Sequence, residues 1–167
     1  MPGFHDALRL YLVEASRPLR QAQARTLGRD DITWTDSVAD LPETPLFLLA
    51  NEFFDALPIR QLVRSGDMWR ERMVGLGENG LRMALAPPAP VPALDHRLTD
   101  TRDGDIVEFA PQAAGIVQLI GARVAQHGGA ALIVDYGDWR ARGDTFQAVK
   151  GHAPVDPLAE PGMADLT

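Results

Sequence analysis

Apolar residues gather into short runs along this chain, and the runs are separated by polar segments that carry turn and capping residues. Four runs have the length of a β-strand and cover residues 8–13, 32–35, 45–50 and 130–134. Successive positions are apolar at 45–50 and 130–134, which is typical of strands buried on both faces. The pattern therefore predicts four strands and places three of them, 8–13, 45–50 and 130–134, in the interior.

Two further segments have helical features. Ser16 precedes Pro18 by two residues, as an N-cap precedes an early helical proline, and the apolar positions continue to Leu27 before Gly28. A second helix is predicted over 111–126, where apolar residues recur at helical spacing and Gly128 follows. Alternating strands and helices indicate a mostly parallel sheet with helices on both faces, which binds ligands at the carboxyl ends of its strands.

A different pattern occupies 59–86. Three β-compatible runs are separated by Ser65-Gly66-Asp67 and by a second turn signal at 77–80, which predicts an antiparallel meander. The proline-rich segment 87–92 follows as an extended connector. Residues 137–167 contain few apolar runs and many turn residues, so we expect a loop-rich tail there.

Length and composition narrow the class of protein. A chain of 167 residues with 46% hydrophobic residues predicts one globular domain with a core of its own. The absence of cysteine excludes a disulfide framework, a thiolate metal site and a cysteine nucleophile. The net charge of −7 argues against nucleic acid as a partner, because no surplus of basic residues is present.

Segments for targeting or membrane insertion are not evident in the sequence. The apolar runs are all shorter than the roughly 20 residues of a membrane-spanning helix, so no membrane span is expected. The first residues lack the basic start and long apolar run of a secretory signal. We therefore predict a cytoplasmic protein.

Acceptor-rich residues follow three of the predicted strands: Glu14, the pair Asn51-Glu52, and Asp135. A carboxylate just past a strand can accept the hydroxyl groups of a ribose, so the pattern fits a ligand that contains a nucleoside. The alternative is that these residues cap the following helices or meet solvent. The histidines do not have the spacing of paired metal ligands, and we predict no metal site.

The densest group of polar, acidic and aromatic residues is 51–58, which follows Leu-Leu-Ala. Together with 13–16, 69–76, 127–137 and the segments from Gly143 to Thr167, it resembles the class I S-adenosylmethionine-dependent methyltransferases. The resemblance is to the branch that contains the mitochondrial complex I assembly arginine methyltransferase and its bacterial relatives, and it covers nearly the whole chain. It implies an α/β fold with an incomplete Rossmann-like methyltransferase sheet and an inserted antiparallel β-meander.

The resemblance also implies roles for individual residues. Glu14 would bind the ribose of S-adenosylmethionine, Asp36 would lie near the adenine edge, and Asn51 would lie near the methionyl end. Glu52 and Asp55 would face the substrate cavity and orient the guanidinium of a protein arginine. The reaction would be direct methyl transfer, in which the protein supplies proximity and alignment without a metal.

The sequence departs from the family at both ends. The first strand and glycine-rich cofactor loop of the family are missing ahead of Leu8, and the last residues stop where relatives continue. We therefore expect 1–167 to be a single partial methyltransferase domain, with unpaired sheet edges that favour self-association. The alternative hypothesis is a noncatalytic α/β interaction module or a degenerate relative of the enzyme.

Overall fold

The structure is a computed structural model that describes residues 3–137 and 143–167. It divides into two compact units, which are described separately. The first comprises Met1–Leu48 and Gly115–Leu132, and the second comprises Leu49–Ala114 and Ile133–Thr167.

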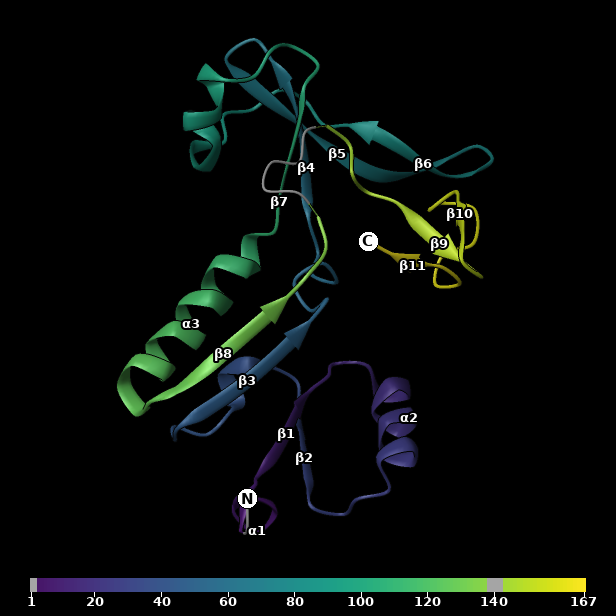
Figure 1. Cartoon of the computed structure of the whole chain (residues 1–167). Helices are drawn as coiled ribbons and strands as arrows, with labels where there is room; N and C mark the ends of the chain where they lie inside the picture. The colour runs from purple at the N-terminus through teal and green to yellow at the C-terminus, as the bar shows by residue number, and fades with distance from the viewer. Residues whose placement is uncertain (1–2, 138–142) are drawn as a thin grey trace. The chain divides into compact units, whose positions relative to one another are not determined.

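Helices and strands alternate from α1 to β3 and from η2 to β8, whereas β4 to β6 and β9 to β11 are runs of strands (Figure 1). In chain order the elements are α1 (Phe4–Ala7), β1 (Leu10–Val13), α2 (Arg17–Leu27), β2 (Ile32–Thr35), η1 (Val38–Asp40), β3 (Leu46–Asn51), β4 (Arg60–Ser65), β5 (Met68–Gly77), β6 (Gly80–Leu85), η2 (Pro92–Thr99), β7 (Ile106–Phe109), α3 (Pro111–His127), β8 (Gly129–Val134), β9 (Ala148–Lys150), β10 (Ala153–Val155) and β11 (Asp165–Leu166).

The first unit contains a parallel strand pair joined by a capped helix. β1 pairs with β2 in register from Leu10 opposite Ile32 to Val13 opposite Thr35. Between them, α2 has Ser16 as its N-cap and ends at Gly28, whose φ of 56° is left-handed. The predicted helix is confirmed here, because capping residues and glycine stops act over only a few positions. The two strands are also confirmed, but β1 is not in the interior as predicted, since none of its residues is buried.

β3 and β8 are neighbouring strands whose arrows point the same way in Figure 1. The Leu46 amide donates to the Gly128 carbonyl over 3.1 Å where the pair begins. A Cβ added to Gly129 would lie 1.9 Å from the Leu46 carbonyl oxygen, so only glycine fits this close approach.

The prediction that these two strands are buried is wrong. Burial alternates along β3, where Phe47 and Leu49 are each 82% exposed, and every residue of β8 is exposed. An apolar run shows which residues could be buried, but burial also requires neighbouring elements to cover them.

The second unit has a four-stranded antiparallel sheet in the order β6-β5-β4-β7. β4, β5 and β6 occupy the three β-compatible runs of 59–86, and β7 is an additional strand that the sequence did not predict. The core of this unit is formed by Leu62, Trp69, Leu94 and Val107. Two backbone hydrogen bonds of 2.9 Å join Trp69 to Ala89, so the proline-rich connector lies against β5.

The tail contains short strands rather than loops alone. β9 pairs with both β10 and β11 in antiparallel fashion, and hydrogen bonds of 2.9 and 3.1 Å join Gln147 to Thr167. These strands are two or three residues long, too short for a periodic pattern in the sequence. Residues 138–142 of the predicted tail lie outside the described residues.

No helix in the part of the chain that the structure describes has the length and apolarity needed to cross a membrane.

Candidate functional site

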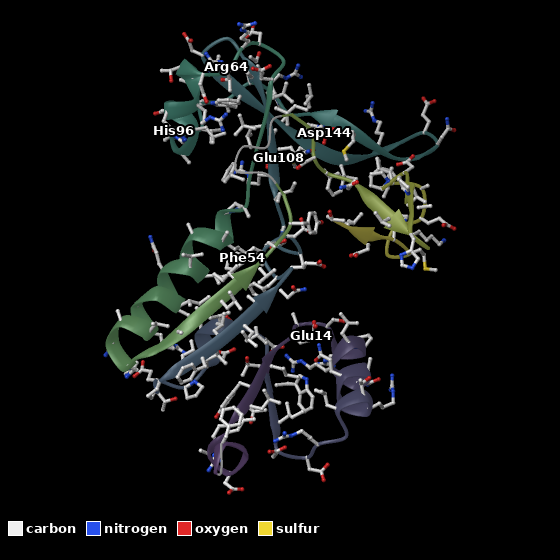
Figure 2. All side chains as sticks on the ribbon, in the orientation of Figure 1. Glu14, Phe54, Arg64, His96, Glu108 and Asp144 are labelled. Atoms are coloured by element: carbon white, nitrogen blue, oxygen red, sulfur yellow. The ribbon has the colours of Figure 1, made fainter. Side chains whose placement is uncertain are left out.

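Glu14 lies directly after β1 and beside α2 (Figure 2). Its carboxylate oxygens accept hydrogen bonds from the Ser16 amide over 2.8 Å and from the Gln23 side chain over 3.2 Å. Since Ser16 is the N-cap of α2, Glu14 helps to stabilise the start of this helix. Each carboxylate oxygen can accept about two hydrogen bonds, so the half-buried side chain retains capacity for ligand hydroxyl groups.

Asp36 follows β2 in the same unit and is linked to Glu14 through one arginine. The Arg20 guanidinium pairs with the Asp36 carboxylate and donates to the Glu14 carbonyl oxygen. The Asp36 side chain is 79% exposed, so it remains accessible despite this ion pair. The structure thus brings together two of the predicted cofactor-binding residues at the carboxyl ends of paired parallel strands.

Asn51 and Glu52 lie at the end of β3, and both are exposed. The Glu52 amide donates to the Val134 carbonyl of β8 over 2.9 Å. Glu52 has a φ of 53°, and His152 is the other non-glycine residue with a positive φ in the described part of the chain. A left-handed backbone at a residue with a Cβ is strained, and such strain is common at functional sites.

Asp55 is held by two residues that follow β8. Its amide donates to Asp135 Oδ2 over 3.1 Å, and its own Oδ2 accepts a hydrogen bond of 2.6 Å from the Tyr136 hydroxyl. The Tyr136 amide donates to Asp135 Oδ1 over 3.0 Å. The hydrogen bond to Asp55 is the main cause that raises the pKa of Tyr136 above its usual value.

The second unit therefore gathers Asn51, Glu52 and Asp55 with Asp135 at the ends of β3 and β8, while Glu14 and Asp36 belong to the first unit. Sequence analysis missed Tyr136, and it also missed Arg20 and Gln23 as partners of the acidic residues. The position of Tyr136 directly after Asp135 was the one signal available for it. Among the described residues, no group of His, Asp and Glu could hold a metal ion.

The chain matches a family of known proteins over all of its 167 residues. A family model described as "Putative S-adenosyl-L-methionine-dependent methyltransferase" matches residues 1–167. The protein arginine methyltransferase NDUFAF7, mitochondrial, of Danio rerio is 36% identical over 181 residues, covering 95% of this chain and 43% of the relative. Its Homo sapiens counterpart is 34% identical over 183 residues, covering 95% of this chain and 41% of the relative. The chain spans less than half the length of these curated relatives.

A solved structure is also similar. A likely methyl transfer enzyme from Burkholderia thailandensis, crystallised with S-adenosyl-homocysteine bound, matches with a TM-score of 0.73 and 28% identity. The match covers 96% of this chain and 45% of that protein. The mixed α/β architecture is therefore shared with a methyltransferase.

The comparisons correct one prediction. The relatives from Danio rerio, Homo sapiens and Caenorhabditis elegans are all named as mitochondrial proteins. This finding contradicts the cytoplasmic location predicted from the sequence.

Proposed function

The chain belongs to the S-adenosyl-L-methionine-dependent methyltransferases, and from this premise we propose that it takes part in methyl transfer to the guanidinium of a protein arginine. The observation that carries the proposal is the Asp55 carboxylate, fixed at the ends of β3 and β8 by Asp135 and Tyr136. The relatives named as protein arginine methyltransferases support arginine as the methyl acceptor.

S-adenosylmethionine is the cofactor of this family, and three of the predicted residues have the chemistry to hold parts of it. Glu14 would accept the ribose hydroxyl groups, because its oxygens each have lone pairs beyond those used by Ser16 and Gln23. The exposed Asp36 carboxylate would accept from the adenine amino group, and the Asn51 amide would bind the methionyl end. When bound, the cofactor supplies a methyl group made electrophilic by its sulfonium charge.

Glu52 and Asp55 would orient the acceptor. A guanidinium presents its donors in a planar fork, and carboxylates are its best matched partners. The two carboxylates lie three residues apart in one segment, and among the described residues no hydrogen-bond donor is paired with Asp55 Oδ1. The net charge of −7 also favours a cationic side chain over a nucleic-acid backbone as the partner.

We further propose that residues 1–167 belong to a single, partial methyltransferase domain. In this domain the meander of 59–86 is an insertion, and 137–167 is the tail. The family match over the same residues supports this assignment. The insertion would interrupt a Rossmann-like sheet to which β1, β2, β3 and β8 contribute.

Calorimetric titration of S-adenosylmethionine into the 167-residue chain tests the cofactor part of the proposal. We expect saturable binding by the wild type and its loss in Glu14→Gln, which removes the charge but keeps the size of the side chain. Glu43→Gln is the matched control, because Glu43 is an exposed acidic residue of the same unit. Equal binding by both variants would refute the role of Glu14.

Transfer of a radiolabelled methyl group to arginine peptides tests the acceptor part. We expect Asp55→Asn to lower transfer at least about tenfold, since a hydrogen bond to a charged group contributes roughly 1.5–3 kcal/mol. A folded wild-type chain that binds the cofactor but methylates lysine in preference to arginine peptides would contradict the proposed acceptor.

The proposal includes self-association of the chain. β1 pairs only with β2, and β3 only with β8, among the strands of the described residues. Each of these two-stranded sheets has edges that could accept another strand, and the apolar residues Phe47 and Leu49 on β3 are largely exposed. Exposed edges and apolar side chains together favour association.

A further inference from the structure

Tyr136 is an exposed aromatic residue whose hydroxyl group has a defined place. Although 56% of the residue is exposed, its hydroxyl donates to Asp55 Oδ2 over 2.6 Å, across 81 residues of sequence. An exposed tyrosine is free to direct its hydroxyl to water, so a short contact with a carboxylate is a specific feature of this site.

The contact is one of two hydrogen bonds that join the residues after β8 to Asp55, and a third lies between Asp135 and Tyr136 themselves. Asp135 Oδ2 accepts from the Asp55 amide, and Asp135 Oδ1 accepts from the Tyr136 amide. Asp135 therefore holds the backbone amide of Asp55 through one carboxylate oxygen and the backbone amide of Tyr136 through the other. With the main chain held, the remaining freedom of the Asp55 carboxylate is rotation of its side chain, which the Tyr136 hydroxyl restricts.

The direction of the hydrogen bonds at Tyr136 follows from the single proton of its hydroxyl group. That proton is directed to Asp55, so Thr167 Oγ1, which also contacts the hydroxyl, is the donor in the second hydrogen bond. The hydroxyl thus donates to Asp55 and accepts from Thr167, and its orientation is defined on both sides. Among the described residues, none donates a hydrogen bond to Asp55 Oδ1.

We propose that Tyr136 is a positioning residue, which holds the Asp55 carboxylate through Oδ2 so that Oδ1 meets the guanidinium of the substrate. The inference rests on the proposed function for the identity of the substrate. A carboxylate whose rotation is restricted loses less conformational freedom when one of its oxygens binds a planar guanidinium.

A role for Tyr136 as a general base does not fit its environment. The hydrogen bond to Asp55 raises the pKa of Tyr136, with further contributions from burial and from the charges of Asp55 and Asp135, while the hydrogen bond with Thr167 lowers it. The phenol is thus a neutral donor at neutral pH and a poor proton acceptor there.

Titration of the phenol in solution tests the contact without any methyl transfer. The chain contains two tyrosines, so Tyr11→Phe leaves Tyr136 as the sole source of the phenolate absorbance. We expect Tyr136 to ionise above the ordinary pKa of about 10, and Asp55→Asn to shift its titration downward. Glu52→Gln is the control and should leave the pKa of Tyr136 unchanged.

A titration at the ordinary value that Asp55→Asn does not move would overturn the proposal, because the hydrogen bond would then be absent in solution. Circular dichroism of each variant verifies that the chain remains folded. Since this readout needs neither cofactor nor substrate, it decides the contact even if the chain transfers no methyl group and the proposed function fails.

A double-mutant cycle tests what the contact does. Tyr136→Phe removes one oxygen atom and should lower kcat/KM for an arginine peptide about tenfold, with unchanged binding of S-adenosylmethionine. In an Asp55→Asn background the same change should have little further effect, because the two side chains act as one unit. Losses that multiply independently would show that Tyr136 acts apart from Asp55 and would overturn the positioning role.

Discussion

Among the residues that the structure describes, Glu52 and His152 have side chains and yet adopt the left-handed backbone that glycine favours. For residues with a Cβ this conformation costs about 1–2 kcal/mol relative to the right-handed one. Glu52 follows β3 directly and is proposed to bind the substrate, so strain at this position would be retained for function rather than for stability.

Glu52→Gly should therefore stabilise the chain while it impairs methyl transfer. The relief of backbone strain outweighs the added entropy of glycine in the unfolded chain, and we expect a gain of up to about 1 kcal/mol. The midpoint and slope of urea unfolding, compared with the wild type, measure this gain.

His152→Gly is the matched control, because His152 has a φ of 63° and lies in the short turn between β9 and β10. It should show a similar gain in stability. A loss of stability in both variants would mean that the left-handed conformations are not strained in solution, and that Glu52 does not retain strain for function.

At the scale of elements, Asp144 attaches the segment before β9 to the four-stranded sheet. Its carboxylate accepts from Gln61 of β4 over 2.7 Å and pairs with Arg72 of β5. Glu108 of β7 adds a second attachment by accepting from the Thr145 amide over 3.0 Å. Figure 2 shows Glu108 and Asp144 near each other in this network.

The Asp144 attachment predicts a dependence of stability on pH. Burial opposes ionisation of this carboxyl group, but hydrogen bonds from Arg72 and Gln61 prevail and hold its pKa below the usual value. A lowered pKa in the folded state stabilises the chain above the unfolded pKa, and the contribution is lost as pH falls through the folded pKa. Asp144→Asn should thus destabilise the chain by about 1 kcal/mol at pH 7, allowing for solvent screening of a side chain that is 43% exposed.

Urea unfolding of the wild type and of Asp144→Asn at several pH values measures this contribution. The difference between them should disappear in acid, below the usual pKa of an aspartic acid. Glu78→Gln in the exposed turn between β5 and β6 is the control and should have no effect of this kind. A difference that persists unchanged into acid would show that the charge of Asp144 is not what holds the segment.

The sequence predicted those elements whose signals are local. α2 carries its N-cap and glycine stop within a few residues, and the turns at 65–67 and 77–80 separate β4, β5 and β6 as expected. β7 was missed, although β1 and β2 of the same length were predicted, because Glu108 interrupts its apolar run and its partner β4 lies far away in the sequence. Such pairing between residues distant in sequence leaves no periodic pattern in a strand so short.

The candidate site was predicted only in part for the same reason. The rule that ligands bind at the carboxyl ends of strands identified Glu14, Asn51 and Glu52, each of which lies at such an end. The hydrogen bond between Tyr136 and Asp55 joins two loops and has no local sequence signal. The roles assigned to individual acidic residues stay predictions, since they depend on ligands that the sequence and fold alone do not display.

At the scale of the whole molecule, exposed apolar side chains on β3 predict association between copies. The mass measured by light scattering after size exclusion should exceed that of the monomer and rise with concentration. Phe47→Glu places a charge among these side chains and should shift the population toward monomer, because burying an unpaired charge is costly.

Leu76→Glu is the matched control, because Leu76 on β5 is exposed to the same extent, 82%, as Phe47. It should leave the association unchanged. A wild-type chain that remains monomeric at every concentration, or an equal effect of the two variants, would contradict association through β3.

The separation of β3 from β8 along the chain has a consequence for biosynthesis. Asn51 ends β3 and Gly129 begins β8, so the ribosome must add the whole meander, and α3 after it, before the partner strand exists. At a synthesis rate of about 5–20 residues per second, β3 remains without its partner strand for roughly 4–16 s. The meander's hairpins form from near neighbours within that interval, whereas the nascent β3, with Phe47 and Leu49, is a natural binding site for a chaperone.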